Sequence, residues 1–289
     1  MAHCNSSPPL DKRRSGILLH PTSLPGPFAS GVIGEDAYRF VDFLSETGYS
    51  VWQTLPLGPT HGDGSPYQAL SVHAGNPHLI DLQWLADKGW LAEQELHNCY
   101  AEVIGRSKCL SLAAEHFRQF ATEEQMSAFD TFIHKQGFWL DDYALYCALK
   151  SKYHNTSWLD WPEALRSRRK KTLRETREQL RFEIYYYQFE QFVFFTQWLG
   201  LKAYARDKGI FLFGDLPIFV AHDSADVGAQ REFFKLDEHG KSTVIAGVPP
   251  AYFSAPGPRW GNPHYRWAVR DHPHFSGWGE RLDSNRELF

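Results

Sequence analysis

An aspartate that directly follows an apolar run is the first candidate for chemistry in this sequence. Asp215 comes after Ile210–Phe213 and Gly214, and α/β proteins gather their active sites at the carboxyl ends of parallel strands. A carboxylate held there by a rigid element can bind a ligand hydroxyl or act as a base. The alternative is an aspartate that begins a loop or caps a helix, although Leu216 and Pro217 disfavour a helix start.

Hydroxyl and indole side chains in two loops rich in Gly and Pro are the next candidates. Ser65 and Tyr67 lie in the loop 58–77, and Trp260 lies beside Asn262 in a later loop. Hydroxyls can hydrogen-bond a sugar or an alcohol, and an indole can bury the C–H face of a sugar ring. These residue types suit carbohydrate binding. Turn chemistry alone, or a tryptophan that only covers the core, would explain the same residues without a ligand.

Other motifs narrow the chemistry further. His20 ends the first apolar run and is either a satisfied buried histidine or a site residue. The sequence holds no P-loop, G-x-G-x-x-G, H-E-x-x-H or G-x-S-x-G motif, so phosphate, dinucleotide, zinc-protease and serine-hydrolase chemistry lose support. The four cysteines show no metal-ligand spacing, and we expect no metal.

Three short apolar runs are predicted to be the strands that position these residues. The runs 16–20, 50–55 and 210–215 each stop near Pro or Gly, and a helix is predicted over 34–47 with Gly48 as its C-cap. Strand, helix, strand at this spacing is typical of a parallel sheet. The third run is continuous in apolar residues, which favours a strand buried on both faces.

The organisation of the chain follows from a change of pattern along it. We expect a disordered lead-in over 1–14, first βα units with a substrate loop over 15–82, and a mainly helical insertion over 83–208. The region 209–289 is expected to hold the next strand and substrate-facing loops. Within the insertion, the basic run 166–177 reads as a solvated helix face, because acidic residues interrupt it.

Composition excludes several classes of function. The 289 residues are 43% hydrophobic and 22% charged, as in ordinary soluble domains, and 30 basic against 34 acidic residues give a net charge of −4. This charge argues against nucleic acid as the main partner. The chain has neither a long apolar span nor an apolar secretory region, and its cysteines do not form a disulfide framework. We therefore expect a cytoplasmic protein without a membrane partner.

The number of strands limits the architecture. A (β/α)₈ barrel takes about 250 residues for eight units, whereas the helical stretch here leaves room for only three confident parallel strands. The fold is therefore either a small open sheet or the front part of a longer chain.

Several long motifs are shared with a known family. The chain resembles the 4-α-glucanotransferases, also called amylomaltases or disproportionating enzymes, from about residue 15 to its end. The segments that carry the resemblance are GILLHPTSLPGPF (16–28), VWQTLPLGPT (51–60), SPYQALSVHAGNP (65–77), FWLDDYAL (138–145), GDLPIFVAHDSADV (214–227), GVPPAYFS (247–254) and RWGNPHYRW (259–267).

The resemblance implies a fold and a reaction. It implies the first strands of a (β/α)₈ TIM barrel with a large helical insertion, and no cofactor. It also implies transfer of α-1,4-glucan segments, or maltooligosaccharides, to acceptor glucans or glucose with retention of configuration. Retention requires a carboxylate nucleophile and a second carboxyl group that acts as acid and then base.

The resemblance also assigns residues. Ser65, Tyr67, Asp215 and Trp260 match substrate-binding positions. The nucleophile, the acid/base and a third carboxylate are expected beyond Phe289, so the chain is expected to be an inactive N-terminal portion with no catalytic residue of its own. The alternatives are an α-glucan-binding module and an unrelated barrel enzyme that uses Asp215 as base.

Some positions depart from the family pattern. Gly228 stands where the family usually has Trp, Ala251 where it has an acid, and Pro258 where it often has an amide. Because we place these departures on substrate-facing loops, they would lower the affinity for glucan.

Overall fold

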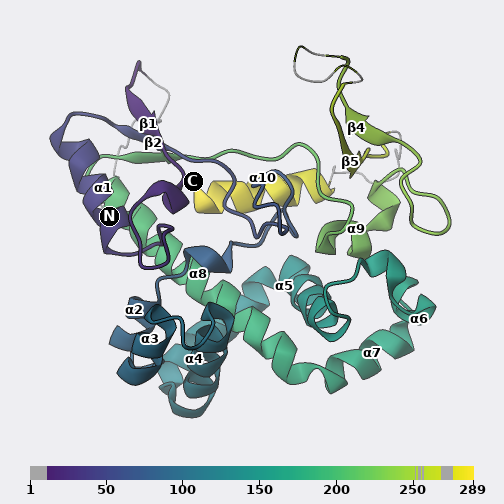
Figure 1. The fold of residues 1–289 in the computed structure, drawn as a ribbon, viewed down its shortest axis with the longest axis horizontal. Coiled ribbons are helices and arrows are strands. Elements are labelled where there is room, and N and C mark those ends of the chain that lie inside the picture. The colour runs from purple at the N-terminus through teal and green to yellow at the C-terminus, as the bar shows by residue number, and fades with distance from the viewer. Residues whose placement is uncertain (1–11, 251, 253–254, 256, 268–275) are drawn as a thin grey trace, which may run out of the picture.

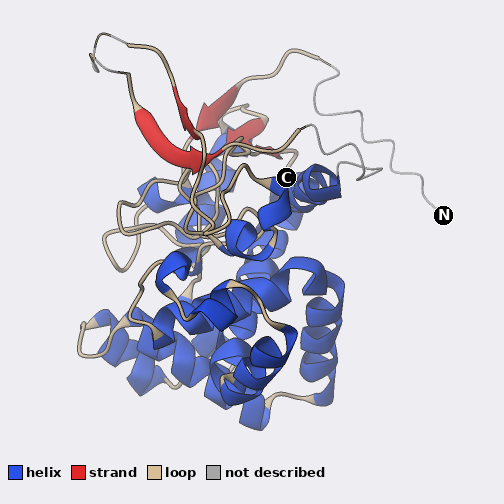
Figure 2. Ribbon diagram, turned by 90° about the vertical axis from the view of Figure 1, so that its right-hand side faces the viewer, coloured by secondary structure: helices blue, strands red, loops and turns tan. Residues whose placement is uncertain are grey.

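The computed structural model describes residues 12–250, 252, 255, 257–267 and 276–289 (Figure 1). Most of the expected lead-in, residues 1–11, lies outside the described residues, as does the departure at Ala251. Within the described part, the strands gather at one end of the molecule and most of the helices at the other (Figure 2). No helix of this part is long and apolar enough to cross a membrane.

A three-stranded parallel sheet holds the three predicted strands. Strands β1 (Gly16–Leu18), β2 (Val51–Gln53) and β3 (Phe211–Phe213) lie in the order β1-β2-β3. Trp52 in the central strand is buried and its Nε1 donates to the carbonyl of Leu19 at 2.8 Å. The prediction of an α/β fold with a small parallel sheet is thus confirmed.

The third strand differs from its prediction in length and burial. Strand β3 ends at Phe213, whose side chain is 45% exposed, so the prediction of a strand buried on both faces is wrong. Among the described residues β3 is an edge strand with one neighbour, which leaves part of its surface uncovered. The chain leaves the sheet at Gly214, where a Cβ atom would lie 2.2 Å from the ring of Phe289.

The first helix connects β1 to β2 as predicted. Helix α1 (Glu35–Glu46) buries Ala37, Val41 and Leu44, one face of a 3.6-residue period. Gly48 follows with φ +80°, the left-handed conformation that glycine adopts freely after a helix.

Helices form all the regular structure between the second and third strands. They are α2 (Leu82–Asp87), α3 (Glu93–Tyr100), α4 (Arg106–Phe120), α5 (Glu123–Lys152), α6 (Glu163–Arg166), α7 (Lys170–Gln179) and α8 (Arg181–Asp207), with short 3₁₀ turns at Pro77–Leu79 and Trp158–Asp160. Helix α8 runs from beside α7 to the side of the sheet, next to α1 (Figure 1). Aromatic rings fill the core between α4, α5 and α8; for example, the ring centroids of Phe117 and Phe189 lie 5.2 Å apart.

The basic run is only partly a solvated face. Arg168 and Arg177 both donate to Oδ1 of Asp142, at 2.6 and 3.1 Å, and so fasten the run to α5. Lys170 and Lys171 are exposed, as expected. The solvated-face prediction therefore holds for the lysines and is wrong for these two arginines.

The last part of the chain contains elements that the sequence did not predict. Helix α9 (Ala225–Ala229) is followed by an antiparallel hairpin, β4 (Ile245–Gly247) and β5 (Arg259–Pro263), and by helix α10 (Ser276–Leu288). Further 3₁₀ turns lie at Pro21–Ser23 and Arg231–Phe233. Trp198 and Lys202 of α8 donate to the carbonyls of Leu288 and Glu287, at 2.8 and 2.7 Å, and thereby hold the end of α10.

Candidate active-site cleft

A cleft of about 940 Å³ opens where the chain leaves β2 and β3. Three segments line it: the loop 58–77, the segment 215–223 after β3, and the strand β5. The predicted site residues Ser65, Tyr67, Asp215 and Trp260 all line this cleft. His20 does not line it.

A hydrogen bond joins two of the predicted residues. The hydroxyl of Tyr67 donates to Oδ2 of Asp215 at 2.7 Å. This carboxylate acceptor stabilises the protonated phenol and raises the pKa of Tyr67 above its ordinary value, with a smaller contribution from burial. Nearby, Oδ1 of Asp63 accepts from the backbone N–H of Ser65 at 3.1 Å and shapes the turn that carries Ser65. The cleft thus combines a fixed carboxylate with the hydroxyls of Ser65 and Tyr67.

An indole borders the same cleft. Trp260 lies in β5 with its side chain 50% exposed. Gly261, which follows it, has φ +79°, a conformation that strains any residue with a Cβ. A half-exposed indole beside hydroxyls and a carboxylate can bind a flat C–H surface while its polar neighbours bind hydroxyls.

His20 has a structural role outside the cleft. Its Nδ1 lies 2.7 Å from Oγ1 of Thr22 and also accepts from the backbone N–H of Thr22, which caps the turn Pro21–Ser23. Burial lowers the pKa of His20. The structure thus places His20 outside the cleft, but His20 is not a fully satisfied histidine, because its buried Nε2 has no hydrogen-bond partner among the described residues.

An ion pair fastens one wall of the cleft to the helices. Nζ of Lys150 in α5 lies 2.7 Å from Oδ2 of Asp223, and Oδ1 of Asp223 accepts from the hydroxyl of Tyr146 at 3.0 Å and from the N–H of Trp158 at 3.2 Å. Because these three donors satisfy the carboxylate, Asp223 holds its segment in place, although it borders the cleft.

A buried polar cluster lies beneath the same wall. Arg281 of α10 donates to the carbonyls of Pro217 and Ile218 and to the hydroxyl of Tyr265. Burial raises the pKa of Asp226 to about 6 and lowers the pKa of His73 to about 3, and the positive charge of Arg281 lowers both.

The sequence analysis missed several residues of the cleft and its support. They are His61, Asp63, Gln68, His222 and Asp223 at the cleft, and His73, Asp226 and Arg281 beneath it. Asp63 and His61 lie close to Ser65 in the loop 58–77, so their positions in the sequence could have indicated that they lie at the cleft. The other residues depend on contacts between distant segments.

The departures from the family pattern do not cluster at the cleft as expected. Gly228 lies in α9, where an added Cβ would touch the indole of Trp158 at 3.7 Å, and it does not line the cleft. Pro258 precedes β5, and its carbonyl accepts from the N–H of Val248 at 3.2 Å. The placement of Gly228 on a substrate-facing loop is therefore wrong, because Gly228 lies in a helix and outside the lining of the cleft.

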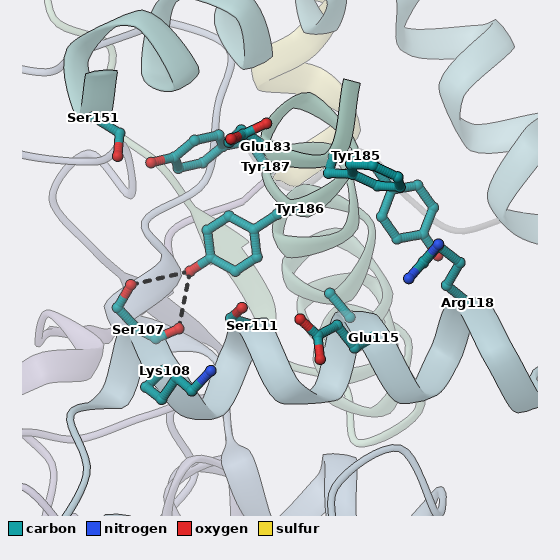
Figure 3. Close-up of a pocket in the computed structure, with 12 residues that line it drawn as sticks. Ser107, Lys108, Ser111, Glu115, Arg118, Ser151, Glu183, Tyr185, Tyr186 and Tyr187 are labelled. Carbon is teal, nitrogen blue, oxygen red and sulfur yellow. Dashed lines mark hydrogen bonds between the residues drawn. The ribbon is translucent and has the colours of Figure 1, made fainter. Parts of the chain in front are cut away.

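A second cavity of about 690 Å³ lies between α4 and α8 (Figure 3). Tyr185, Tyr186 and Tyr187 border it, and the hydroxyl of Tyr186 lies 3.3 Å from Oγ of Ser107. None of the predicted site residues lies there. We take the cleft as the candidate active site because it is formed by segments that follow the carboxyl ends of the parallel strands.

Comparison with known proteins shows which family the chain resembles. A family model described as 4-alpha-glucanotransferase matches residues 19–289. The chain is 47% identical over 283 residues to a 4-alpha-glucanotransferase of Thermus thermophilus, covering 96% of this chain and 57% of the relative. It is 44% identical over 290 residues to a 4-alpha-glucanotransferase of Synechocystis, with 96% and 57% coverage.

A solved structure extends the likeness to three dimensions. The amylomaltase from Streptococcus agalactiae in complex with acarbose superposes with a TM-score of 0.90 at 37% identity, covering 96% of this chain and 58% of that protein. The chain thus spans between half and two thirds of the length of these relatives. Since the family model matches the chain from residue 19 to residue 289, the chain belongs to the 4-alpha-glucanotransferase family.

Proposed function

We propose that the cleft binds α-1,4-glucan chains for transfer to an acceptor glucan or glucose. The observation that carries the proposal is the Tyr67–Asp215 hydrogen bond in a cleft that the indole of Trp260 also borders. A glucose unit has C–H faces that fit an indole and hydroxyls that fit a carboxylate and a phenol. The acarbose complex of the Streptococcus agalactiae amylomaltase supports the same class of ligand.

In this proposal each predicted residue has a role in binding. Trp260 packs against the face of one sugar unit, and Ser65 and Tyr67 hydrogen-bond sugar hydroxyls. Asp215 accepts hydrogen bonds and holds a negative charge near the cation that develops when a glycosidic bond breaks. Because that cation exists only near the transition state, the charge would act mainly on the rate.

The transfer step needs groups beyond these four. A retaining reaction uses two carboxyl groups about 5–5.5 Å apart, one as nucleophile and one as acid and then base. We propose that these groups, and a third carboxylate, belong to the part of the family's length that this chain does not match. We also propose that β1, β2 and β3 are strands of a (β/α)₈ barrel, that residues 83–208 are its insertion, and that the protein is cytoplasmic.

Two measurements on the polypeptide 1–289 test the proposal. We expect maltoheptaose, an α-1,4 chain, to bind in a calorimetric titration, whereas the β-1,4 chain cellohexaose does not bind. Equal binding of both chains, or of neither, would contradict α-glucan recognition.

Activity separates transfer from binding alone. We expect no release of glucose from maltotriose by 1–289, since the three catalytic carboxylates are proposed to lie elsewhere. Release at a rate above background would show that this chain is catalytic by itself and would make Asp215 the first candidate for nucleophile or base. Binding without release is also what the alternative of an α-glucan-binding module predicts. A family-length protein with the same first 289 residues decides between the two, because a transferase releases glucose from maltotriose and forms longer maltooligosaccharides, whereas a binding module does neither.

A further inference from the structure

Two side-chain amides pair directly at the edge of the cleft. Nε2 of Gln68 donates to Oδ1 of Asn262 at 2.9 Å, and Nδ2 of Asn262 donates to Oε1 of Gln68 at 3.3 Å. The two residues are 194 positions apart in the sequence, and Asn262 is only 4% exposed. We call this reciprocal pair the amide clasp.

Two backbone carbonyls fix the orientation of the clasp. The second N–H of Asn262 reaches the carbonyl of Val220 at 2.8 Å, and Nε2 of Gln68 also lies 3.4 Å from the carbonyl of Trp260. Each amide nitrogen carries two hydrogens, so all four N–H groups of the pair have acceptors. A flipped amide would place its oxygen against a carbonyl. The clasp therefore has one favourable arrangement.

The clasp joins the three segments that line the cleft. Gln68 follows Tyr67 in the loop 58–77, Val220 lies after β3, and Asn262 lies in β5 two residues from Trp260. Within the described ranges, every hydrogen bond between that loop and the β4–β5 hairpin involves Gln68. In the same ranges, no aromatic ring stacks on Trp260.

We propose that Gln68 and Asn262 are positioning residues that hold the indole of Trp260 in its glucan-binding position. The inference rests on the proposed function, because it takes Trp260 as a sugar-binding platform. A half-exposed indole on a short hairpin loses freedom when a ligand binds, and a clasp that fixes it in advance lowers that cost. Gln68 acts through Trp260 and does not itself need to touch the glucan.

The first experiment reads the indole without any ligand. The protein is labelled with 5-fluorotryptophan, and the fluorine resonance of Trp260 is assigned from its loss in Trp260→Phe. Gln68→Leu replaces the amide by an aliphatic side chain that is one bond shorter, and it removes both hydrogen bonds to the Asn262 amide. We expect this variant to shift or broaden the Trp260 resonance while the melting temperature shows that the fold is retained. Gln94→Leu is the matched control, because Gln94 pairs with Asn98 on α3 and neither residue lines the cleft.

The second experiment measures maltoheptaose binding in a double-mutant cycle. We expect Gln68→Leu to weaken binding about tenfold, or about 1.4 kcal/mol, and Gln94→Leu to leave it unchanged. In a Trp260→Ala background, Gln68→Leu should change the affinity less than twofold, because residues that act through one another are not additive. A residue that only stabilises the fold would not produce this coupling.

The outcomes separate the positioning role from the proposed function. An unchanged Trp260 resonance in Gln68→Leu overturns the positioning role, as does an equal loss of affinity with and without the indole. A changed resonance together with the expected coupling supports it. If the unmodified chain binds no maltoheptaose, the proposed function fails, and the fluorine spectrum alone decides whether the clasp positions Trp260.

Discussion

The hydroxyl oxygen of Tyr67 lies 2.7 Å from Oδ2 of Asp215, although 148 positions separate the two residues in the sequence. One residue comes from the loop after β2 and the other from the segment after β3. Adjacent parallel strands end at the same edge of the sheet, so their following segments meet there. This geometry brings a carboxylate and a phenol into one cleft.

Removing the charge of Asp215 should change the titration of Tyr67. In Asp215→Asn the acceptor loses its negative charge, so the phenolate is disfavoured less, and we expect the pKa of Tyr67 to fall toward its ordinary value. Ring-labelled tyrosine followed by NMR through alkaline pH measures this shift. A pKa for Tyr67 that is the same in both proteins would show that the hydrogen bond does not persist in solution.

Removing the indole of Trp260 should weaken glucan binding. Burial of a large aromatic side chain contributes roughly 1.5–3 kcal/mol, which corresponds to about a ten- to hundredfold weaker affinity in Trp260→Ala. Isothermal titration with maltoheptaose measures the change. Phe120→Ala, which removes an aromatic ring that is 73% exposed on α4, is the control and should bind like the parent chain. Unchanged affinity in Trp260→Ala would make Trp260 a cover over the core.

The Lys150–Asp223 ion pair should matter more for stability than exposed pairs do. Its side chains are 11% and 24% exposed, and Asp223 has further donors. Removing one partner of a buried pair costs about 3–5 kcal/mol, so Lys150→Met should lower the free energy of unfolding by roughly that amount. Arg39→Met breaks the exposed Glu35–Arg39 pair and should cost under about 1 kcal/mol. Urea unfolding compares the two variants, and equal losses would contradict a stabilising role for the buried pair.

The open edge of the sheet should promote self-association of the polypeptide 1–289. Strand β3 is an edge strand in the described part of the chain, and its Phe213 is half exposed. Unpaired strand edges with apolar side chains are templates for pairing with other chains. We expect sedimentation velocity to show species larger than a monomer as the concentration rises, and Phe213→Lys to reduce them. Phe120→Lys on α4 should have no effect. A monomer at all concentrations would contradict this prediction.

The strands, and four residues that line the cleft, could be singled out from the sequence because their signals are local. Apolar runs that stop at Pro or Gly indicated β1, β2 and β3. Asp215 directly follows the third run, and Ser65, Tyr67 and Trp260 lie in segments rich in Gly and Pro. Strand lengths were less well predicted. The run 210–215 was expected to be a fully buried strand, but the pairing with β2 extends only over Phe211–Phe213.

The hairpin and the supporting contacts could not be predicted because nothing local specifies them. Strand β4 has only three residues and ends at Gly247, and β5 ends at Pro263, so neither shows an alternating pattern. The partners of the amide clasp are 194 positions apart, and Nδ1 of His73 lies 2.8 Å from Oγ of Ser284, 211 positions away. Such pairs become visible only when the fold is known.

The buried His73 and Asp226 should give opposing contributions to stability as pH changes. Burial raises the pKa of Asp226 to about 6. Between about pH 4 and pH 6 the folded state therefore binds more protons at Asp226 than the unfolded state does. The contribution of Asp226 to stability thus falls as pH rises. Burial lowers the pKa of His73 to about 3. Between about pH 3 and pH 6.5 the unfolded state therefore binds more protons at this histidine, and the contribution of His73 to stability rises with pH. The two slopes oppose each other over the range from 4 to 6.

Asp226→Asn should therefore reveal the contribution of His73. The asparagine keeps the size of the side chain and does not titrate, so the free energy of unfolding should rise with pH between 4 and 6 more steeply than in the parent chain. The difference in slope should be up to about 1.4 kcal/mol per pH unit, the value for one proton. Urea unfolding at a series of pH values measures both slopes. Glu183→Gln, at an exposed position on α8, is the control and should keep the parent slope. Parallel curves for Asp226→Asn and the parent would mean that Asp226 is charged throughout this pH range. The positive charge of Arg281, which acts to lower the pKa of Asp226, would then explain the result.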